Sequence, residues 1–337
     1  MPGLSGLDLQ AELLRRGFDW PIVFMTGHGG IPNVVRAMKN GAVEFIEKPF
    51  TDERLIAALH AGFVALKKNM EESSGSALAE VRTALQREGI FPHYQQKVDL
   101  ASGRIVGFEA LIRWGSSRKG DNSKLIHQAF EDAGLGKPLS ERMLECILAD
   151  VAGWSRAGIP FGHVAINASS MDLEDEHFPA RLLRRLEKMR IPADAIHLEV
   201  TESVSVGPDA EQVNKALAAL RDNGIAVALD DFGTGYASLA HLQDLPFDYF
   251  KIDRSFVARF RESSSSSIIK AMIGLARGLG KGIVGEGVES RDQAEFLKDH
   301  GCPIGQGYLF GHAIPAEAAP MLFAAPRHLP KAATRRR

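Results

Sequence analysis

Two adjacent carboxylates follow an apolar run in the segment IAVALDDFGTG, which covers Ile225–Gly235. The run Ile225–Leu229 has the composition of a strand that is buried on both faces, and Asp230 and Asp231 come directly after it. Neighbouring carboxylates at the rim of a packed sheet repel each other unless a cation or a proton separates them. Oxygen ligands of this kind suit Mg²⁺ or Mn²⁺. Taken alone, the pair could equally cap the helix that follows.

The same arrangement, a polar side chain at or near the end of a short strand, recurs along residues 91–310. Each of these side chains taken singly could face solvent or satisfy a backbone group. Several carboxylates and a lysine gathered at one end of a sheet would be costly without cations or close pairing, so together they predict a cation site. The strands and their polar residues are His93–Val98 with Gln95, Arg104–Arg113 with Glu109 and Arg113, His163–Asn167 with Asn167, Ile196–Val200 with Glu199 and then Glu202, Ile225–Leu229 with Asp230 and Asp231, Phe247–Ile252 with Lys251, Lys281–Gly285 with Glu286 and Glu289, and Cys302–Gly305 with Gln306.

Helical patterns separate most of these strands. Eight strands with helical crossovers over about 230–250 residues predict a (β/α)₈ barrel, in which the carboxyl ends of the strands meet around one axis. That end of a barrel is where chemistry is placed, so the fold would bring the polar residues together. The serine run Ser263–Ser267 is expected to be an exposed loop. The expected helices are Leu139–Ala157, Pro179–Met189, Asp209–Asn223, Ile268–Leu279 and Arg291–His300.

Residues 1–66 carry a separate pattern of strands and helices. The short apolar strands Pro21–Thr26 and Val43–Ile46 alternate with helical segments, which predicts a parallel sheet. Residues 67–77 are charged and then small and polar, which is typical of the end of a helix and a linker. The pattern therefore predicts a small α/β unit ahead of the barrel.

The overall composition argues against several classes of function. A formal net charge of −2 gives no electrostatic case for nucleic-acid binding, and the basic end Arg335–Arg337 is expected to be a solvated terminus. Cys146 and Cys302 form neither a disulfide framework nor a metal-ligand spacing, which suits a reducing cytoplasm. No signal peptide opens the chain, and no apolar run approaches the ~20 residues of a membrane span. We therefore expect a cytoplasmic protein.

The residues from about Ala84 to Ala316 resemble the EAL family of cyclic di-GMP phosphodiesterases. A lone Glu-Ala-Leu tripeptide would carry little information, but many motifs in the right order make the resemblance specific. The motifs are Glu109-Ala110-Leu111 with Ile112-Arg113-Trp114, Asn167 in AINAS, Glu199-Val200-Thr201-Glu202, Asp230-Asp231-Phe232-Gly233-Thr234-Gly235, Lys251-Ile252-Asp253, Glu286-Gly287-Val288-Glu289 and Gln306-Gly307-Tyr308-Leu309-Phe310.

By position, the resemblance implies a two-metal site that hydrolyses cyclic di-GMP to linear pGpG. Two cations about 3.5–4 Å apart would overcome the repulsion between carboxylates and a phosphodiester and would generate hydroxide near neutral pH. The expected ions are Mg²⁺ or Mn²⁺, with Ca²⁺ inhibitory because its longer, looser coordination spoils in-line geometry. The implied roles are metal ligation by Glu109, Asn167, Glu199, Asp230, Asp231 and Glu286, catalysis by Lys251, Glu286 and Glu289, and substrate binding by Gln95, Arg113 and Gln306.

The resemblance also implies that Glu202 anchors the loop Asp231–Ser238, and that two subunits form a homodimer through the barrel. Some positions depart from the family pattern, with Gln96 where proline is usual and Ala237 where serine is common. Phe130 stands where the family often has glutamate. None of these is a predicted metal ligand, so they bear on nucleotide affinity and loop closure more than on the reaction.

Residues 1–66 resemble the C-terminal half of a response-regulator receiver domain. The matching pieces are MPGLSG at residues 1–6, Thr26 in FMTGHG, and Glu47-Lys48-Pro49-Phe50. In that family the threonine and lysine contact a phosphorylated aspartate, and the Lys-Pro bond is often cis. The aspartate and the acidic pair that binds Mg²⁺ precede this half of the domain, so we expect no phosphorelay from these residues alone. A longer natural chain would supply them.

A fragment of this kind exposes a sheet edge and an apolar face, so residues 1–66 should be poorly ordered or covered by a partner chain or by the second domain. The predicted organisation is a receiver fragment at residues 1–66, a linker and helix at 67–83, a phosphodiesterase barrel at 84–320 and a basic tail at 321–337. Two alternatives to hydrolysis remain open. One is a domain that binds cyclic di-GMP without cutting it, and the other is an interaction scaffold.

Overall fold

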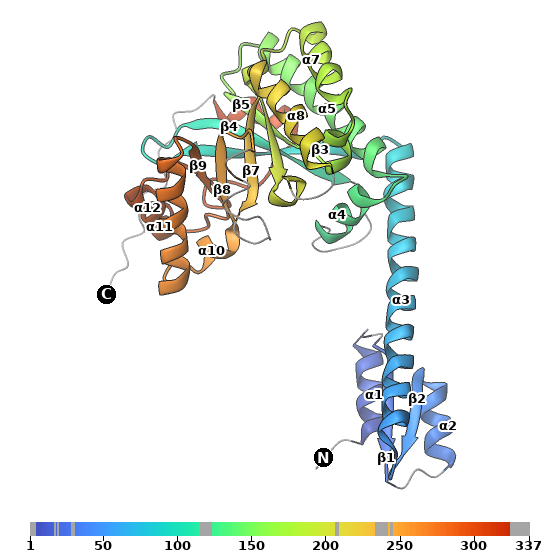
Figure 1. Cartoon of the computed structure of the whole chain (residues 1–337). Coiled ribbons are helices and arrows are strands. Elements are labelled where there is room, and N and C mark those ends of the chain that lie inside the picture. The colour runs from blue at the N-terminus through green and yellow to red at the C-terminus, as the bar shows by residue number, and fades with distance from the viewer. Residues whose placement is uncertain are drawn as a thin grey trace. The chain divides into compact units, whose positions relative to one another are not determined.

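Two units of different size make up the structure, a computed structural model (Figure 1). The chain divides into Met1–Val81 and Arg82–Arg337. The structure describes residues 5–16, 18, 20–27, 31–114, 123–205, 209–232, 242 and 245–323.

The N-terminal unit contains a parallel sheet of two strands. Strand β1 pairs with β2 from Ile22↔Ala42 to Thr26↔Glu47, as the sequence pattern predicts, and the Lys48-Pro49 bond is cis. A helix that we did not expect begins at Ser5, whose side chain forms a capping box with Asp8. The elements are α1 (Gly6–Arg15), β1 (Ile22–Thr26), α2 (Ile31–Lys39), β2 (Ala42–Glu47) and α3 (Asp52–Gln86).

Residues 67–77, which we predicted to be the end of a helix and a linker, are helical throughout. Helix α3 runs without a break over 35 residues, through the whole of that segment. Serine costs only a few tenths of a kcal/mol in a helix and the single Gly75 about 1 kcal/mol. The alanine, glutamate, lysine and leucine residues on both sides are strong helix formers, so the small polar residues do not end the helix.

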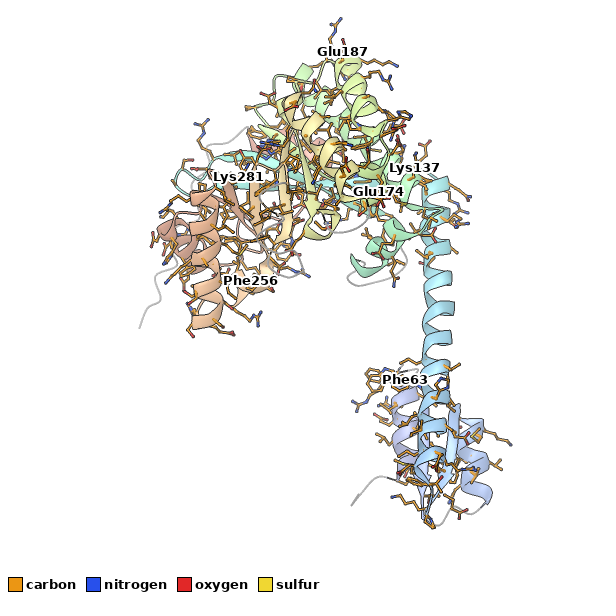
Figure 2. All side chains as sticks on the ribbon, viewed as in Figure 1. Phe63, Lys137, Glu174, Glu187, Phe256 and Lys281 are labelled. Carbon is orange, nitrogen blue, oxygen red and sulfur yellow. The ribbon has the colours of Figure 1, made fainter. Side chains whose placement is uncertain are left out.

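Large apolar side chains of the N-terminal unit are exposed, as expected for an incomplete sheet. On α3, Ile56 is 64% exposed and Phe63 is 69% exposed, and Phe63 projects from the helix in Figure 2. The opposite stripe of the helix, which includes Ala58 and Gly62, is buried, and Gly62 faces Val23 of β1. That a partner chain or the second domain covers the exposed side chains stays a prediction.

The larger unit is a closed barrel of eight strands in the order β10-β3-β4-β5-β6-β7-β8-β9. This confirms the predicted barrel, but β3 runs antiparallel to both of its neighbours, β4 and β10. The connection from β3 to β4 is only a short turn, which cannot carry a parallel crossover. The strands are β3 (Ile90–Asp99), β4 (Ile105–Trp114), β5 (His163–Asn167), β6 (Ile196–Thr201), β7 (Ala226–Phe232), β8 (Tyr249–Ile252), β9 (Gly282–Gly285) and β10 (Ile304–Gln306).

Helices cover the outside of the barrel (Figure 1). The serine run at residues 263–267 is the first turn and a half of α11 rather than a loop, and Ser265 within it is buried. Phe323, which the sequence assigned to the tail, lies with its ring centroid 6.1 Å from that of Phe108. The helices are α4 (Ser123–Glu131), α5 (Gly136–Arg156), α6 (Ser170–Glu174), α7 (Phe178–Met189), η1 (Ala193–Ala195), η2 (Glu202–Ser205), α8 (Ala210–Asp222), α10 (Arg254–Ala258), α11 (Ser263–Gly278), α12 (Arg291–His300) and η3 (Ala316–Leu322).

Aromatic rings fill one end of the barrel interior, which we call the floor layer: His163, His197 and Tyr249. The two imidazole rings stack with centroids 3.7 Å apart, and the Tyr249 ring lies 5.5 Å from that of His197. Glycines leave room for these rings, since a Cβ at Gly107 would lie 2.5 Å from the His163 ring and one at Gly282 would lie 2.3 Å from Tyr249.

The polar residues of the site stand directly on this floor layer. Alternate residues of a strand face the same side, so Glu109, Glu199 and Lys251 follow Gly107, His197 and Tyr249 on the inner face of β4, β6 and β8. The floor layer and the surrounding strands therefore hold the charged side chains inside the barrel, close to its axis.

Candidate active site

The carboxylates predicted from the strand ends converge on the ammonium group of Lys251. Its Nζ atom lies 2.5 Å from Glu199 Oε2, 2.5 Å from Glu286 Oε1, 3.0 Å from Asp230 Oδ2 and 3.8 Å from Glu109 Oε2. Lys251 is 1% exposed. Four strands, β4, β6, β7 and β8, and the segment after β9 contribute to this cluster.

Amide side chains orient Glu109 from the opposite side. Gln306 Nε2 donates to Glu109 Oε2 at 2.6 Å and to Gln95 Oε1 at 3.2 Å, and Asn167 Nδ2 donates to Glu109 Oε1 at 3.2 Å. Gln95 faces Glu109 across the antiparallel pair of β3 and β4, so it reaches the site from the middle of its strand. Its Nε2 atom donates to the carbonyl of Gly311 at 3.1 Å.

The charged groups of the cluster shift one another's pKa. Burial alone would lower the pKa of Lys251, but Glu109 and the other carboxylates outweigh it and raise that pKa well above its usual value. Burial alone would raise the pKa of Glu199, but Lys251 and Lys97 outweigh it and lower that pKa to about 2. Burial together with nearby carboxylates raises the pKa of Glu109 and of Glu286. The cluster thus carries more carboxylates than its lysines neutralise.

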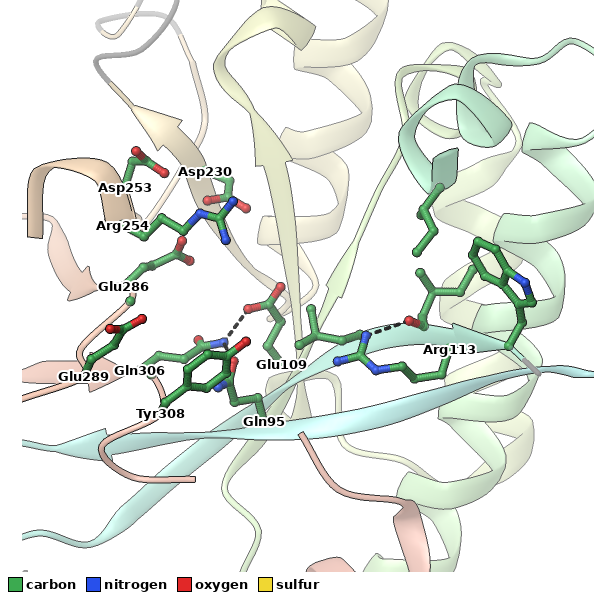
Figure 3. Close-up of a pocket in the computed structure, with 16 residues that line it drawn as sticks. Gln95, Glu109, Arg113, Asp230, Asp253, Arg254, Glu286, Glu289, Gln306 and Tyr308 are labelled. Atoms are coloured by element: carbon green, nitrogen blue, oxygen red, sulfur yellow. Dashed lines mark hydrogen bonds between the residues drawn. The ribbon is translucent and has the colours of Figure 1, made fainter. Parts of the chain in front are cut away.

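An open pocket of about 770 Å³ lies over this cluster (Figure 3). Asp230, Glu286 and Glu289 line one side of it. Arg113 lines it farther along β4, with its Nη1 atom donating to the carbonyl of Ile112 at 2.7 Å. A large anion could therefore contact both the acidic cluster and a guanidinium group.

The structure adds pocket residues that the sequence reasoning missed. Asp253, Arg254 and Tyr308 line the pocket, and the Tyr308 side chain is 61% exposed. Asp253 and Tyr308 lie within motifs that the sequence shows, and Arg254 directly follows one, so their place in or beside these motifs was the available signal. Lys97 was missed as well, although it stands two residues after Gln95 on the same inner face of β3.

Other predicted residues lie outside this cluster or outside the described part of the chain. Glu202 is buried in η2, but most of the loop that it was expected to anchor lies beyond the described residues, and so do the side chain of Asp231 and Ala237. Gln96, where the family has proline, donates from Nε2 to the carbonyl of Phe310. In the N-terminal unit, Thr26 ends β1 and the backbone N–H of Lys48 donates to its carbonyl at 2.7 Å.

The donor set of the cluster suits hard divalent cations. Glu109, Glu199, Asp230 and Glu286 offer only carboxylate oxygens, and all four lie around one cationic centre. Within the described residues, no group of three or more His, Cys, Asp and Glu side chains is spaced as the ligands of one ion, because the Lys251 ammonium lies between the carboxylates. Binding of an ion would therefore move Lys251 away from some of its present partners.

Comparison with known proteins identifies the family. Residues 78–313 match the EAL domain, and residues 1–60 match the response regulator receiver domain. The chain belongs to the EAL domain family. No helix in the described part of the chain has the length and apolarity needed to cross a membrane.

Named relatives and solved structures share the barrel region. A cyclic di-GMP phosphodiesterase of Pseudomonas aeruginosa is 40% identical over 225 residues, which is 66% of this chain and 38% of that protein. The probable cyclic di-GMP phosphodiesterase PdeB of Escherichia coli is 35% identical over 70% of this chain and 45% of its own length. The chain therefore spans less than half the length of these two curated relatives.

Among solved structures, the PaMucR phosphodiesterase in complex with c-di-GMP has a TM-score of 0.67 and 34% identity, over 72% of this chain and 99% of that one. The EAL enzyme Bd1971, bound to cAMP and cyclic di-GMP, has a TM-score of 0.70 and 25% identity, over 82% of this chain and 76% of that one.

Proposed function

We propose that the barrel hydrolyses cyclic di-GMP to linear pGpG with two divalent cations, Mg²⁺ or Mn²⁺. The observation that supports this most directly is the convergence of Glu109, Glu199, Asp230 and Glu286 beneath an open pocket. The named relatives and the complex of a similar barrel with c-di-GMP support the choice of substrate.

The proposed metal-binding residues are the four carboxylates that surround the Lys251 ammonium, together with Asn167 and Asp231. Bound ions supply positive charge to the phosphodiester and lower the pKa of water. Asp230 would be a ligand of both ions. The proposed ligands are Glu109, Asn167, Glu199, Asp230, Asp231 and Glu286.

The chain's own groups then handle the attacking water. Lys251 donates hydrogen bonds from its ammonium group and orients the water, and the Glu286 carboxylate accepts its proton. Water adds across one P–O bond of the ring, which breaks to leave one phosphate ester and one hydroxyl group. Glu289, on the same wall of the pocket, holds this side of the site in place.

Substrate binding is assigned to the pocket above the cluster. Arg113 and Arg254 line it and bring positive charge to a dinucleotide that carries two phosphates. The exposed ring of Tyr308 offers a face for a guanine base. Gln306 donates hydrogen bonds to both Gln95 and Glu109. Contacts of Gln95 and Gln306 with the substrate would therefore extend the network that orients Glu109, a proposed metal ligand.

The alternatives to hydrolysis are a receptor that binds cyclic di-GMP without cutting it and an interaction scaffold. Lys251 and all the proposed ligand positions carry the residue types that hydrolysis requires. A receptor does not need a lysine held among four carboxylates, which favours catalysis.

The test is to incubate the purified protein, residues 1–337, with cyclic di-GMP and Mn²⁺ and to follow linear pGpG by chromatography. Glu109→Gln and Glu286→Gln should each lower turnover by a factor of at least about 10³, whereas the exposed Glu295→Gln control should match the unaltered chain. Binding without turnover would support the receptor, and no binding would support the scaffold. Full activity of Glu286→Gln would refute the role given to that residue.

Further properties follow from the same proposal. Ca²⁺ should inhibit, because its ligand distances of about 2.3–2.6 Å do not suit a site built for Mg²⁺ at about 2.0–2.1 Å. We also propose a homodimer through the barrel and a cytoplasmic location, as the sequence indicates.

A further inference from the structure

A second buried lysine lies beneath the acidic cluster, on the antiparallel strand of the barrel. Lys97 occupies the inner face of β3, opposite Gly107 of β4 and Gln306 of β10. Its side chain is 3% exposed, and its Nζ atom lies 2.5 Å from Glu199 Oε1. Neither the predicted roles nor the proposed reaction uses this residue.

Glu199 is therefore held by two lysines, one on each carboxylate oxygen. Lys97 contacts Oε1 and Lys251 contacts Oε2, and the Glu199 side chain is completely buried. One ammonium group would neutralise this carboxylate. The second brings a further charge into the barrel, and burying a charge is costly unless it has a specific partner. Besides lowering the pKa of Glu199, Lys97 occupies its Oε1 oxygen, and the Oε2 oxygen faces Lys251 in the cluster.

The surroundings keep Lys97 in this position. The stacked rings of His163 and His197 fill the floor layer of the barrel, and Gly107 leaves the space that the His163 ring occupies. With packed rings in the floor layer and Glu199 on the other side, the ammonium of Lys97 has its carboxylate partner on the side of the cluster.

We propose that Lys97 is a positioning residue for the metal site, holding Glu199 so that only its Oε2 oxygen is directed to an ion. This inference rests on the proposed function, in which Glu199 is a ligand. Groups that orient metal ligands from outside the coordination sphere change metal affinity by about 10- to 100-fold when they are removed.

The test measures Mn²⁺ binding by calorimetry and by the EPR signal of free Mn²⁺, without substrate. Lys97→Met should bind Mn²⁺ about 10- to 100-fold more weakly, whereas Lys97→Arg, which keeps a charged donor, should recover most of the affinity. Lys281→Met is the matched control. Lys281, labelled in Figure 2, directly precedes β9 and is half-buried, and its Nζ atom contacts the carbonyl and ring of Phe247 rather than any described carboxylate of the cluster.

The loss of Mn²⁺ affinity caused by Lys97→Met should also require Glu199. In a Glu199→Gln background, adding Lys97→Met should change Mn²⁺ affinity by less than about twofold, because the oriented ligand is already lost. This pair also covers the case in which Lys97→Met alone removes the partner of Glu199 Oε1 and fails to fold, which circular dichroism without metal would show.

Three outcomes would overturn the inference: unchanged Mn²⁺ affinity in folded Lys97→Met, tighter binding, or an equal loss in both backgrounds. Tighter binding would mean that Lys97 acts only as a repelling charge. Mn²⁺ binding without hydrolysis by the unaltered chain would refute the proposed reaction and leave Lys97 testable. No Mn²⁺ binding by the unaltered chain would refute both.

Discussion

Two sheets, one open and one closed, follow each other in this chain. The N-terminal unit has two strands and leaves Ile56 and Phe63 of α3 largely exposed. The barrel has eight strands and buries Phe108 and Phe250 completely or almost so. Both are built from short apolar strands and amphipathic helices, so local sequence does not explain the difference. Closure of the sheet does, because it removes the edges and encloses an interior.

Closure also explains why the barrel holds charges that an open sheet could not. Glu109, Glu199 and Lys251 come from three strands, and each reaches the same axis only because the sheet returns to its starting strand. In the N-terminal unit, the ends of β1 and β2 place Thr26 opposite Glu47 at the rim of a two-stranded sheet. The difference shows that the cluster of charged residues depends on closure of the barrel sheet rather than on any one sequence motif.

The largest expected difference between the two units is in how a lysine substitution affects turnover. Lys251→Met should lower pGpG formation by a factor of at least about 10³, because it removes the donor at the centre of the cluster. Lys48→Met, the matched change at the end of β2, should leave turnover within about twofold. Similar losses in both variants would mean that the N-terminal unit takes part in the reaction.

A second comparison uses the same substitution in both units. Phe250→Ala should cost the barrel about 3–5 kcal/mol of unfolding free energy, because Phe250 is 1% exposed and leaves a cavity. Phe63→Ala should change stability by about 0.5 kcal/mol or less, because its ring is 69% exposed. Urea unfolding followed by circular dichroism measures both. A large loss for Phe63→Ala would show that another surface covers this ring.

Metal binding should stabilise only one of the units. At an Mn²⁺ concentration of 100 times its dissociation constant, the barrel should gain about 2.7 kcal/mol, and chelation should remove this gain. Hydrogen exchange resolves the units, so protection should rise in β4 to β9 and stay constant in β1 and β2. Equal gains in both would contradict a metal site that is confined to the barrel.

Acid should weaken the barrel through its floor layer. Burial is the main reason that the pKa of His163 is lowered to about 2 and that of His197 to about 4, both below the usual value of 6.5. The unfolded chain therefore binds protons below pH 6.5 that the folded barrel does not, and stability falls as the pH decreases. For His197 the loss is about 2.5 kcal/mol between pH 6.5 and 4.

The variant His197→Gln tests this effect, because glutamine does not titrate in that range. The difference in unfolding free energy between pH 7 and pH 4.5 should be smaller in this variant than in the unaltered chain. An equal difference would show that carboxylates, rather than the floor layer, govern the acid sensitivity of the barrel.

Much of the site was predictable because strand ends carry a local signal. Glu109, Asn167, Glu199 and Asp230 were predicted from their positions at or near the ends of apolar runs, and the structure brings them together. Lys97 was not predicted, because a lysine inside a strand has no local mark that separates an inner from an outer face. The antiparallel direction of β3 was missed for a similar reason, since it depends on a short turn and on pairing with the last strand.

The amino-acid sequence by itself determined the succession of strands and helices, the polar residues that end them, and membership of the EAL family. These features are local, because they depend on the period of apolar residues and on residue types at fixed spacing. Only the tertiary structure decided that Lys251 lies among four carboxylates and that Lys97 holds Glu199 from below. The contacts of Glu199 with Lys97 and Lys251 join residues 102 and 52 positions apart, and they exist because pairing of β10 with β3 closes the barrel.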